Sequence, residues 1–525
     1  MSKVMSADAA AALVPDAATV VVDGSGGGVN EPGLVLAALK ARFEREGHPR
    51  ALTVVHPSGM GNAQGGGIDY LADPGLVSRA IGGHWQWCPG MQRLATSEQI
   101  EAYCLPQGVL SHLFRAIAGR KPGVITSVGL GTFVDPRIDG GRLNAKAKAS
   151  LVEVLELKGE EFLFYPAFKV DVAVIRGTSA DEAGNITMEG EGLFAETLSA
   201  AQAARNSGGM VIAQVKHLKP VGSLDPRQVK VPGIVVDAVV VDPDQRLSFR
   251  TAEDPSLTGA LRVPAGDLTP LPLNERKVIA RRAASELHAG DVANLGFGMP
   301  DGVATILAEE GLGHEVHFTL EQGHIGGVPA TGDDFGMARN QHAMIDAGYQ
   351  FDFYDGGGLD VAVLSFAQVD AHGNVNVSKF GGRIAGIGGF VNISQGAKRV
   401  VFIGTLRAGS QEFEFHDGGV RILREARAPK FVPDVEQISF SGVIARRWKV
   451  PVTYVTERAV FELAEDGLVL TEVAPGIDLE RDVLSQMAFL PRVAQHLKTM
   501  DVRLFSAAAM GLQLKPHTAA KEQAQ

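Results

Sequence analysis

The order of apolar and polar residues along the chain predicts alternating strands and helices. Short runs that are almost continuously apolar are typical of strands in a sheet covered on both faces. The runs that predict strands are residues 18–24, 51–56, 171–175, 209–215, 233–241, 399–405 and 450–457. Between them, apolar residues recurring every three or four positions predict helices over residues 32–46, 275–287 and 301–310. This alternation predicts an α/β fold with mainly parallel sheets flanked by helices.

Two segments of the chain are similar enough to predict two related domains. Residues 162–187 and 351–376 align without a gap, and ten of the twenty-six aligned positions are identical. The identities include a D-V-A-V run and a D-x-x-G-N turn in each copy. A repeat this long is not a solenoid unit. We therefore expect two tandem copies of one domain, each with an open, mainly parallel sheet.

Polar and proline-rich residues separate the two copies. Residues 243–274 show no clear periodicity, which is typical of a linker. We predict an N-terminal domain over residues 1–242, a linker over residues 243–274 and a C-terminal domain over residues 275–516. Residues 517–525 are expected to form a frayed tail.

The two halves differ at one chemically informative position. Each half opens with a strand, a glycine-rich loop, a helix, a second strand and a second glycine-rich loop. When Gly59 is aligned with Gly323, Glu321 of the second half lies opposite Pro57 of the first. Ligands of open parallel sheets bind at the carboxyl ends of the strands. Glu321, at the end of a predicted strand, is therefore a candidate functional residue.

Composition narrows the classes of function. The net charge of −11 disfavours a nucleic acid or an anionic membrane as partner. No run of eighteen apolar residues predicts a membrane span, and the N-terminus is a poor signal peptide. The two cysteines, Cys88 and Cys104, are expected to be packed thiols rather than a disulfide. We therefore expect a cytoplasmic protein, and no motif predicts a metal site.

The glycine-rich loops do not have the spacing of a nucleotide-binding motif. Gly296 and Gly298 are followed by Asp301 where a dinucleotide fingerprint needs a third glycine, and no P-loop motif occurs. The loops at residues 294–300 and 386–392 can instead present backbone N–H groups. A carboxylate that faces such donors has the arrangement of a nucleophile opposite an oxyanion hole.

Glu321 lies in the segment T-L-E-Q-G-H-I-G-G and, taken alone, would be an ordinary surface glutamate. Gly323, Gly326 and Gly327 remove side-chain bulk just after it, as a large ligand would require. A carboxylate that is ionised near neutral pH needs no base. We therefore interpret His324 as a polar turn residue.

Five motifs of the second half, in order, resemble the family I CoA-transferases, and more narrowly their fused single-chain acetate/propionate type. These motifs are N-L-G-F-G-M-P, T-L-E-Q-G-H-I-G-G, F-D-F-Y-D-G-G-G-L-D, D-x-x-G-N-V-N-V-S-K-F and G-I-G-G-F-V-N-I-S-Q. The first half agrees through L-P-Q-G-V, V-G-L-G-T-F-V-D-P-R and A-D-x-x-G-N-I-T. The likeness covers about residues 10–510.

The resemblance implies roles for several residues. Glu321 would be the nucleophile that becomes a glutamyl-CoA thioester, and the backbone N–H groups of Asn294 and Gly389 would form the oxyanion hole. Gln107 would bind the substrate carboxylate. The positions that would contact CoA are Gly296, Gly298, Met299, Lys379, Gly386 and Gly388. For Lys379, an ordinary solvated lysine is an equally good interpretation.

The activity that the resemblance implies is CoA transfer of the EC 2.8.3 class, in a ping-pong mechanism. CoA would be a co-substrate, with no permanently bound cofactor. The partners would be an acyl-CoA and small carboxylic acids, and the protein would be a homo-oligomer, either a dimer or a tetramer. No positive charge in the segments around Glu321 could pair with a second carboxylate, so we expect short monocarboxylates as substrates.

Several alternatives remain. Ketoacid members of the family carry a lysine in an A-G-K segment, where this chain has A-G-Y with Tyr349. This difference weakens the interpretation as a succinyl-CoA:3-ketoacid transferase. An acyl-CoA hydrolase on the same scaffold is the second enzyme candidate. A non-catalytic CoA-binding protein is disfavoured by the intact Glu321 among glycine-rich loops. A sugar-phosphate isomerase or deaminase of related topology would need a phosphate loop or an acid/base pair, and neither is evident.

Overall fold

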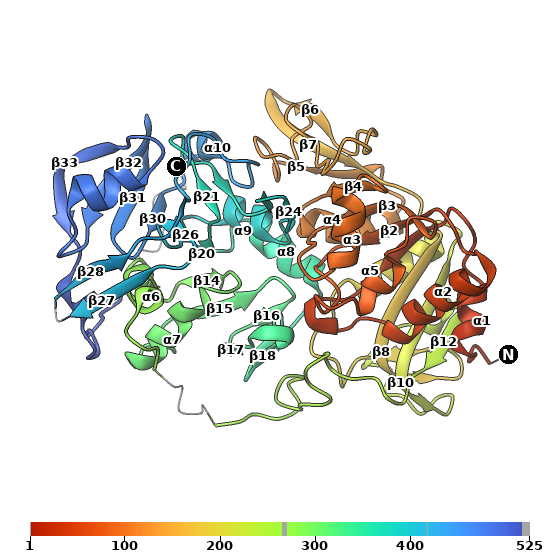
Figure 1. The fold of residues 1–525 in the computed structure, drawn as a ribbon. Helices are drawn as coiled ribbons and strands as arrows, with labels where there is room; N and C mark the ends of the chain where they lie inside the picture. Colours follow the sequence, from red (N-terminus) through yellow and green to blue (C-terminus); the bar gives the residue numbers. More distant parts are fainter. Residues whose placement is uncertain (1, 265–269, 417, 517–525) are drawn as a thin grey trace. The chain divides into compact units, whose positions relative to one another are not determined.

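The computed structural model of the protein describes residues 2–264, 270–416 and 418–516 (Figure 1). The predicted tail, residues 517–525, lies outside the described residues. The chain forms two compact units. The first comprises the described residues of Met1–Val263, Leu320–Asp352 and Ser378–Asn392, and the second those of Pro264–Thr319, Phe353–Val377 and Ile393–Gln525. The second half of the sequence thus contributes two segments to the first unit, and the predicted division into domains of related sequence stays a prediction.

The first unit contains a mainly parallel sheet. Its strands are β1 (Thr19–Val22), β2 (Leu52–His56), β3 (Val77–Gly82), β4 (Glu101–Cys104), β8 (Val172–Asp181), β9 (Ile186–Thr187), β10 (Met210–Lys219), β11 (Val229–Val231) and β12 (Ala238–Val241). The order β12-β10-β8-β1-β2-β3-β4 is parallel throughout, and β9 and β11 add antiparallel pairs. All of β8 is buried, as expected for a strand covered on both faces.

Helices flank this sheet. They are α1 (Ala7–Ala12), α2 (Gly33–Glu46), α3 (Pro89–Thr96), α4 (Gln107–Ala118) and α5 (Thr197–Asn206). The α4 and α5 helices pack against each other, and α5 also packs on β8 and β10. The α2 helix ends where the sequence predicts, because Gly47 adopts a left-handed conformation with φ of 71° that closes the last turn.

The first unit also contains shorter elements. A separate antiparallel sheet consists of β5 (Gly123–Thr126), β7 (Glu160–Pro166) and β6 (Glu153–Leu157). The remaining short elements are η1 (Gly26–Gly28), η2 (Gly67–Leu71), η3 (Gly233–Val235), β16 (His324–Ile325), β17 (Val328–Pro329), η4 (Gly332–Asp334), β18 (Ala338–Arg339), β19 (Ala343–Met344), β23 (Lys379–Phe380) and β24 (Arg383–Ile384). The predicted strand over residues 233–241 is thus split, with a 3-10 turn before the short strand β12.

The second unit also has a sheet with a parallel centre. The strands lie in the order β15 (His317–Leu320), β14 (Val292–Leu295), β20 (Val361–Ser365), β25 (Val400–Ile403), β30 (Val452–Val455), β31 (Ala459–Ala464), β32 (Gly467–Val473) and β33 (Arg492–Thr499). The strands from β15 to β30 are parallel, whereas β31 is antiparallel to both of its neighbours. Both sheets confirm the predicted α/β class.

Helices α6 (Glu275–Ala284) and α7 (Asp301–Glu309) pack together and share a buried core with these strands. Helices α8 (Ala347–Asp355) and α9 (Phe390–Gly396) each begin in a segment of the first unit and end in a segment of the second. The other elements of the second half are α10 (Gly442–Arg447), β13 (His288–Ala289), β21 (Gln368–Val369), β22 (Val375–Asn376), β26 (Arg407–Ala408), β27 (Glu412–His416), β28 (Gly419–Arg424), β29 (Ala428–Pro429), η5 (Leu479–Val483), η6 (Leu484–Gln486), η7 (Val502–Phe505) and β34 (Lys515–Pro516).

The repeated D-V-A-V runs have the same role in both sheets. The N–H of Thr19 donates to Asp171 Oδ2 at 2.9 Å, just before β8 begins. The N–H of Val292 donates to Asp360 Oδ2, also at 2.9 Å, just before β20 begins. An aspartate therefore ties each central strand to its neighbour.

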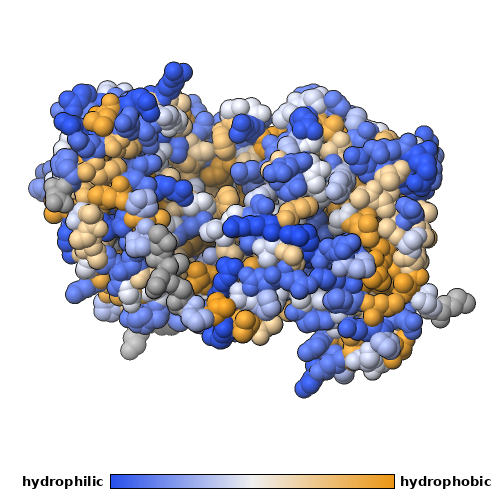
Figure 2. Space-filling view, turned by 60° about the horizontal axis from the view of Figure 1, so that its bottom comes forward, coloured by the Kyte–Doolittle hydropathy of each residue, from blue (hydrophilic) through white to orange (hydrophobic). Residues whose placement is uncertain are grey.

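The distribution of hydrophobic residues and the state of the two cysteines can be compared with the sequence predictions. Within the described residues, no helix combines the length and the hydrophobicity that crossing a membrane requires. On the face that Figure 2 displays, hydrophobic residues are scattered in groups among hydrophilic ones. Cys88 and Cys104 are buried and free, as predicted. Burial raises the pKa of the Cys104 thiol to about 12, so this thiol is protonated at neutral pH.

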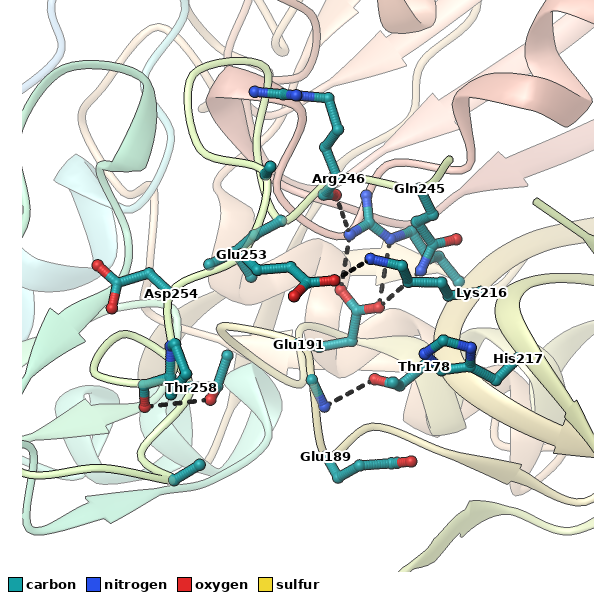
Figure 3. Close-up of a pocket in the computed structure, with 16 residues that line it drawn as sticks. Thr178, Glu189, Glu191, Lys216, His217, Gln245, Arg246, Glu253, Asp254 and Thr258 are labelled. Atoms are coloured by element: carbon teal, nitrogen blue, oxygen red, sulfur yellow. Dashed lines mark hydrogen bonds and ion pairs between the residues drawn. The ribbon is translucent and has the colours of Figure 1, made fainter. Parts of the chain in front are cut away.

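The segment predicted as a linker has no helix or strand in its described residues, 243–264 and 270–274. Part of it covers a pocket of about 280 Å³ against β8 and β10 in the first unit (Figure 3). There Arg176 Nη2 pairs with Glu191 Oε2 at 2.9 Å and donates to the Arg246 carbonyl at 2.5 Å. Lys216 of β10 pairs with Glu253. These contacts fasten the segment to the sheet, and no described residue predicted for the functional site lines this pocket.

Candidate active site

Glu321 lies on a tight turn that directly follows β15. The N–H of Gly323 donates to the carbonyl of Leu320 at 3.0 Å, so Glu321 and Gln322 are the two central residues of that turn. Glu321 is partly buried and Gln322 is buried. The side-chain amide Nε2 of Gln322 donates to Glu321 Oε1 at 3.2 Å. The Gln322 amide therefore contacts the carboxylate of the candidate nucleophile.

The glycines after Glu321 have a different role from the predicted one. Gly323 has φ of 110°, and a Cβ there would lie 2.0 Å from the carbonyl oxygen of Ile345. Gly327 has φ of 82°, and a Cβ there would lie 2.4 Å from the Arg339 carbonyl oxygen. The requirement for glycine therefore arises inside the chain, from the close approach of residues 339–345, and these positions are no argument for a bulky ligand.

His324 is not the polar turn residue that the sequence suggests. It begins the short strand β16 and is fully buried. Burial lowers the pKa of its imidazole to about 4, although backbone groups of Gly192 and Gly336 act in the opposite direction. The ring is therefore neutral at neutral pH, in a buried position next to the turn that carries Glu321.

Gln107 and the 386–389 loop, which are far apart in the sequence, meet in the first unit. Gln107 is the first residue of α4, and its N–H donates to the carbonyl of Gly388 at 2.9 Å. The next N–H, of Gly108, donates to Asn392 Oδ1 at 3.1 Å. The first N–H groups of a helix have no partner within the helix. Gly388 of the loop and Asn392 of α9 therefore cap α4, since the N-cap residue Pro106 makes no side-chain hydrogen bond.

The side chain of Gln107 also faces this loop. A Cβ built on Gly388 would lie 3.7 Å from Gln107 Oε1 and 3.8 Å from His84 Cβ. Gly388 has φ of 52°, a conformation in which glycine is the least strained residue. Gln107, Gly388 and His84 therefore lie close together at the amino end of α4.

His84 is a residue that the sequence reasoning missed. It follows β3 and forms an isolated bridge with Gly386. Burial, with a smaller contribution from repulsion by His56, lowers the pKa of the His84 imidazole to about 4. His56 is the last residue of β2, so both histidines lie at the carboxyl ends of adjacent parallel strands. That location was the available signal, since ligands of parallel sheets bind there.

The remaining predicted residues of the 378–392 segment are found in the first unit. Lys379 begins the short strand β23 and is partly buried. Gly386 has φ of 77°, and a Cβ there would lie 2.8 Å from His84 Cα. Gly389 is buried and directly precedes α9.

The N-L-G-F-G-M-P residues belong to the second unit, around the carboxyl end of β14. Asn294 lies inside β14, and its Nδ2 donates to the Thr319 carbonyl at 3.1 Å and to Tyr354 Oη at 3.2 Å. Asn294 is paired with β15 on one side and with β20 on the other. Because backbone N–H groups of central strands usually bond to neighbouring strands, an oxyanion role for the Asn294 N–H rests on the family resemblance alone.

Gly296, Gly298 and Met299 follow β14 and lead into α7. The N–H of Gly298 donates to Asp301 Oδ2 at 3.3 Å, and Gly298 has φ of 90°. Arg276 of α6 donates to the Gly298 carbonyl at 3.2 Å, a cation near this loop that lies outside the sequence motif. Burial raises the pKa of Asp301 to about 6, against opposing effects of the Gly298 N–H and Arg276.

The sequence of this chain is similar to those of known CoA-transferases. The family model "Coenzyme A transferase" matches residues 4–242. The chain is 45% identical to the acetate CoA-transferase YdiF of Escherichia coli (strain K12) over 97% of this chain and 96% of that protein. It is 47% identical to the caffeate CoA-transferase of Acetobacterium woodii over 98% of this chain and 99% of that protein.

The fold is similar to a solved structure as well. The crystal structure of the acyl-CoA transferase YdiF from Escherichia coli O157:H7, described as a thioester complex with CoA, is similar with a TM-score of 0.92. That chain is 44% identical, and the similarity covers 98% of both chains. With sequence and fold in agreement along almost the whole length, the chain belongs to the coenzyme A transferase family, which confirms the predicted enzyme class.

Proposed function

We propose that the protein transfers CoA between an acyl-CoA and a free carboxylate through a thioester on Glu321. The observation that carries this proposal is the Glu321 carboxylate on its tight turn after β15, held by the Gln322 amide at 3.2 Å. The YdiF relative, whose solved structure is described as a thioester complex with CoA, supports CoA as the co-substrate. Cytoplasmic location and a homo-oligomeric state stay predictions.

The proposed reaction needs no base. One Glu321 oxygen adds to the thioester carbonyl of acyl-CoA, and CoA leaves as a thiolate, which gives an acyl-glutamyl anhydride. The thiolate then adds to Cδ of Glu321, and the acyl group leaves as a free carboxylate. A second carboxylate reverses these steps and leaves with CoA. Each addition places negative charge on a carbonyl oxygen, so fixed N–H donors accelerate it.

We assign the other predicted residues to binding. Gln107 would hold the carboxylate of the acid. The backbone around Gly386, Gly388 and Gly389, with Lys379 nearby in sequence, would face CoA or the oxyanion. Gly296, Gly298, Met299 and the Asn294 N–H keep the roles that the family resemblance implies.

Short monocarboxylates remain the proposed substrates. The replacement of the ketoacid-type lysine by Tyr349 supports this choice less than the sequence alone suggests. The Arg115 guanidinium lies 4.6 Å from the centre of the Tyr349 ring, which is 56% exposed. Arg115 is eight residues after Gln107 on α4, or about 12 Å along the helix. Tyr349 therefore lies near the end of α4 opposite to Gln107.

A second substrate class is favoured by one comparison. The 47% identity to a caffeate CoA-transferase makes an aromatic acid a candidate acceptor. A panel of acetate, propionate, butyrate, succinate and caffeate against one acyl-CoA donor distinguishes the classes through kcat/KM. Succinate matching propionate would contradict the monocarboxylate proposal.

The covalent step is tested by mass. Enzyme incubated with acyl-CoA and no acceptor should gain the mass of CoA, and Glu321→Ala should not. Glu315→Ala is the matched control, because Glu315 is a partly exposed glutamate just before β15. An active wild-type enzyme without an adduct, and with intersecting rather than parallel-line kinetics, would exclude the ping-pong mechanism.

A further inference from the structure

The turn that carries Glu321 also holds a second group that touches the reacting carboxylate. Gln322 is 4% exposed, and its Nε2 donates to Glu321 Oε1 at 3.2 Å. This contact is to one oxygen, Oε1, of the Glu321 carboxylate.

Gly336 lies beside the Gln322 amide. A Cβ on Gly336 would lie 3.1 Å from Gln322 Cδ and 3.3 Å from its Nε2. Gly336 has φ of 98°, so a glycine here both permits the turn and leaves room for the amide. Because Gln322 is buried, its amide is packed among protein atoms, as a preorganised donor must be.

The other end of the same amide has no partner. Gln322 Oε1 is buried and makes no hydrogen bond to any described residue. A buried acceptor without a partner destabilises the fold, whereas an apolar side chain of the same length would avoid that cost. The hydrogen bond from Gln322 Nε2 to Glu321 Oε1 gives a reason for keeping an amide at this buried position.

We propose that Gln322 is a catalytic residue whose Nε2–H stabilises the negative charge that forms on Glu321 Oε1. This inference rests on the proposed glutamyl-CoA mechanism. Because Gln322 holds Oε1, Oε2 is the oxygen that attacks the acyl-CoA and becomes the bridging oxygen of the anhydride. Oε1 stays as the glutamyl carbonyl oxygen.

The addition of CoA thiolate to the anhydride is the step that Gln322 would accelerate. When the CoA thiolate adds to Cδ, the carbonyl electron pair moves onto Oε1. When the pair returns, the Cδ–Oε2 bond breaks and the acyl carboxylate leaves with Oε2. Oε1 shares one charge with Oε2 in the free carboxylate but carries it alone in the tetrahedral intermediate. A donor fixed on Oε1 therefore binds the intermediate more strongly than the resting enzyme, which is the condition for catalysis.

The inference is tested on the isolated thioester with hydroxylamine as the nucleophile. Hydroxylamine nitrogen adds to Cδ of the glutamyl-CoA, the charge moves to Oε1, and CoA leaves as the thiolate, with Glu321 left as a hydroxamate. This reaction needs no acceptor acid, so it measures Oε1 stabilisation separately from carboxylate binding. Released thiol and intact protein mass report its rate.

Gln322→Met keeps the length of the side chain and removes the donor. We expect its thioester to react with hydroxylamine about 10²- to 10³-fold more slowly than the wild-type thioester, the usual effect of losing one oxyanion donor. KM values for acyl-CoA and acid should change little. Gln350→Met is the matched control, since Gln350 is also buried in the first unit and neither atom of its amide has a described partner.

The outcomes separate the two claims. Equal thioester reactivity in the wild type and Gln322→Met overturns the role of Gln322 alone, whereas a wild-type enzyme that forms no thioester overturns the proposed function as well. If Gln322→Met does not fold, Gln322→Glu preserves the shape. Its thioester should also react slowly above the pKa of the added carboxyl group, which the pH dependence of the rate locates, because the ionised carboxylate donates no hydrogen bond.

Discussion

Replacing Gly388 by alanine tests whether the meeting of α4 with the 386–389 loop forms part of the active site. Gly388 has φ of 52°, so an alanine in this left-handed conformation should lower the free energy of unfolding by about 1–2 kcal/mol. The new Cβ meets nothing closer than 3.7 Å, which is ordinary van der Waals contact. We therefore expect Gly388→Ala to fold with only a modest loss of stability.

The activity of the same variant should fall much further. Its Cβ enters the space between Gln107 Oε1, at 3.7 Å, and His84 Cβ, at 3.8 Å. If Gln107 binds the acid there through Nε2 of the same amide, the methyl group displaces a hydrogen bond to a charged carboxylate, which contributes about 1.5–3 kcal/mol. This corresponds to an increase of about 10- to 150-fold in KM for the acid.

The matched control carries the same strain without the contact. Gly382 has φ of 75° in the turn between β23 and β24, and a Cβ there would meet nothing within 4 Å. Thermal unfolding of both variants should give similar losses of stability, and steady-state kinetics with acetate as the varied substrate should differ only for Gly388→Ala. If Gly388→Ala keeps the wild-type KM for the acid, the space beside Gln107 is not the carboxylate site.

Three further predictions follow from the same geometry. Glu321→Asp should retain the fold but lower kcat by about 100-fold, since a retreat of about 1 Å misaligns the nucleophile, and a near-wild-type kcat would contradict this. Asn392→Ala should lower the free energy of unfolding by about 1–3 kcal/mol because the Gly108 N–H loses its acceptor, whereas Asn392→Asp should preserve most of the stability; equal losses would exclude the capping role. Burial lowers the pKa of His56 to about 4, so the unfolded state binds a proton first and stability should fall as the pH drops from about 6.5 to 4. Denaturant titrations at several pH values should show that the free energy of unfolding depends less on pH in His56→Phe than in the wild type. An unchanged pH dependence would refute the lowered pKa of His56.

The candidate site residues were predicted from the comparison of the two halves and from the family resemblance. Glu321 stood out because the first half has Pro57 at the aligned position, and the structure places Glu321 directly after β15, where a strand end was predicted. Gln107 and the 386–389 loop were assigned from motifs, and the hydrogen bond between Gln107 and Gly388 joins them. The contact between Gln322 and Glu321 was not evident, because no sequence pattern indicates which side chain of a turn bends back onto its neighbour.

Other features depend on contacts between distant parts of the chain. The predicted reason for Gly323 and Gly327 was ligand space, but both are required by the approach of residues 339–345. The cap of α4 comes from Asn392, which is 284 residues away. His84 becomes noticeable only when β2 and β3 are adjacent. None of these contacts leaves a periodicity in the sequence.

The repeat shows most directly what the sequence determined by itself. Its D-x-x-G-N turns are local, because the Asp181 and Asp370 carboxylates accept hydrogen bonds from residues two and four positions later in both copies. Such contacts form wherever the same residues occur, since their partners are within the turn itself.

The segment before those turns was decided by tertiary structure. The F-x-F-Y residues are identical in the two copies, yet residues 162–165 lie in strand β7 and residues 351–354 lie in helix α8. In β7 they pair with β5 and β6, and Tyr165 Oη donates to the Val128 carbonyl. In α8, Tyr354 Oη donates to Thr319 Oγ1 instead. Aromatic residues fit either element, so the partners that bury them select the backbone conformation.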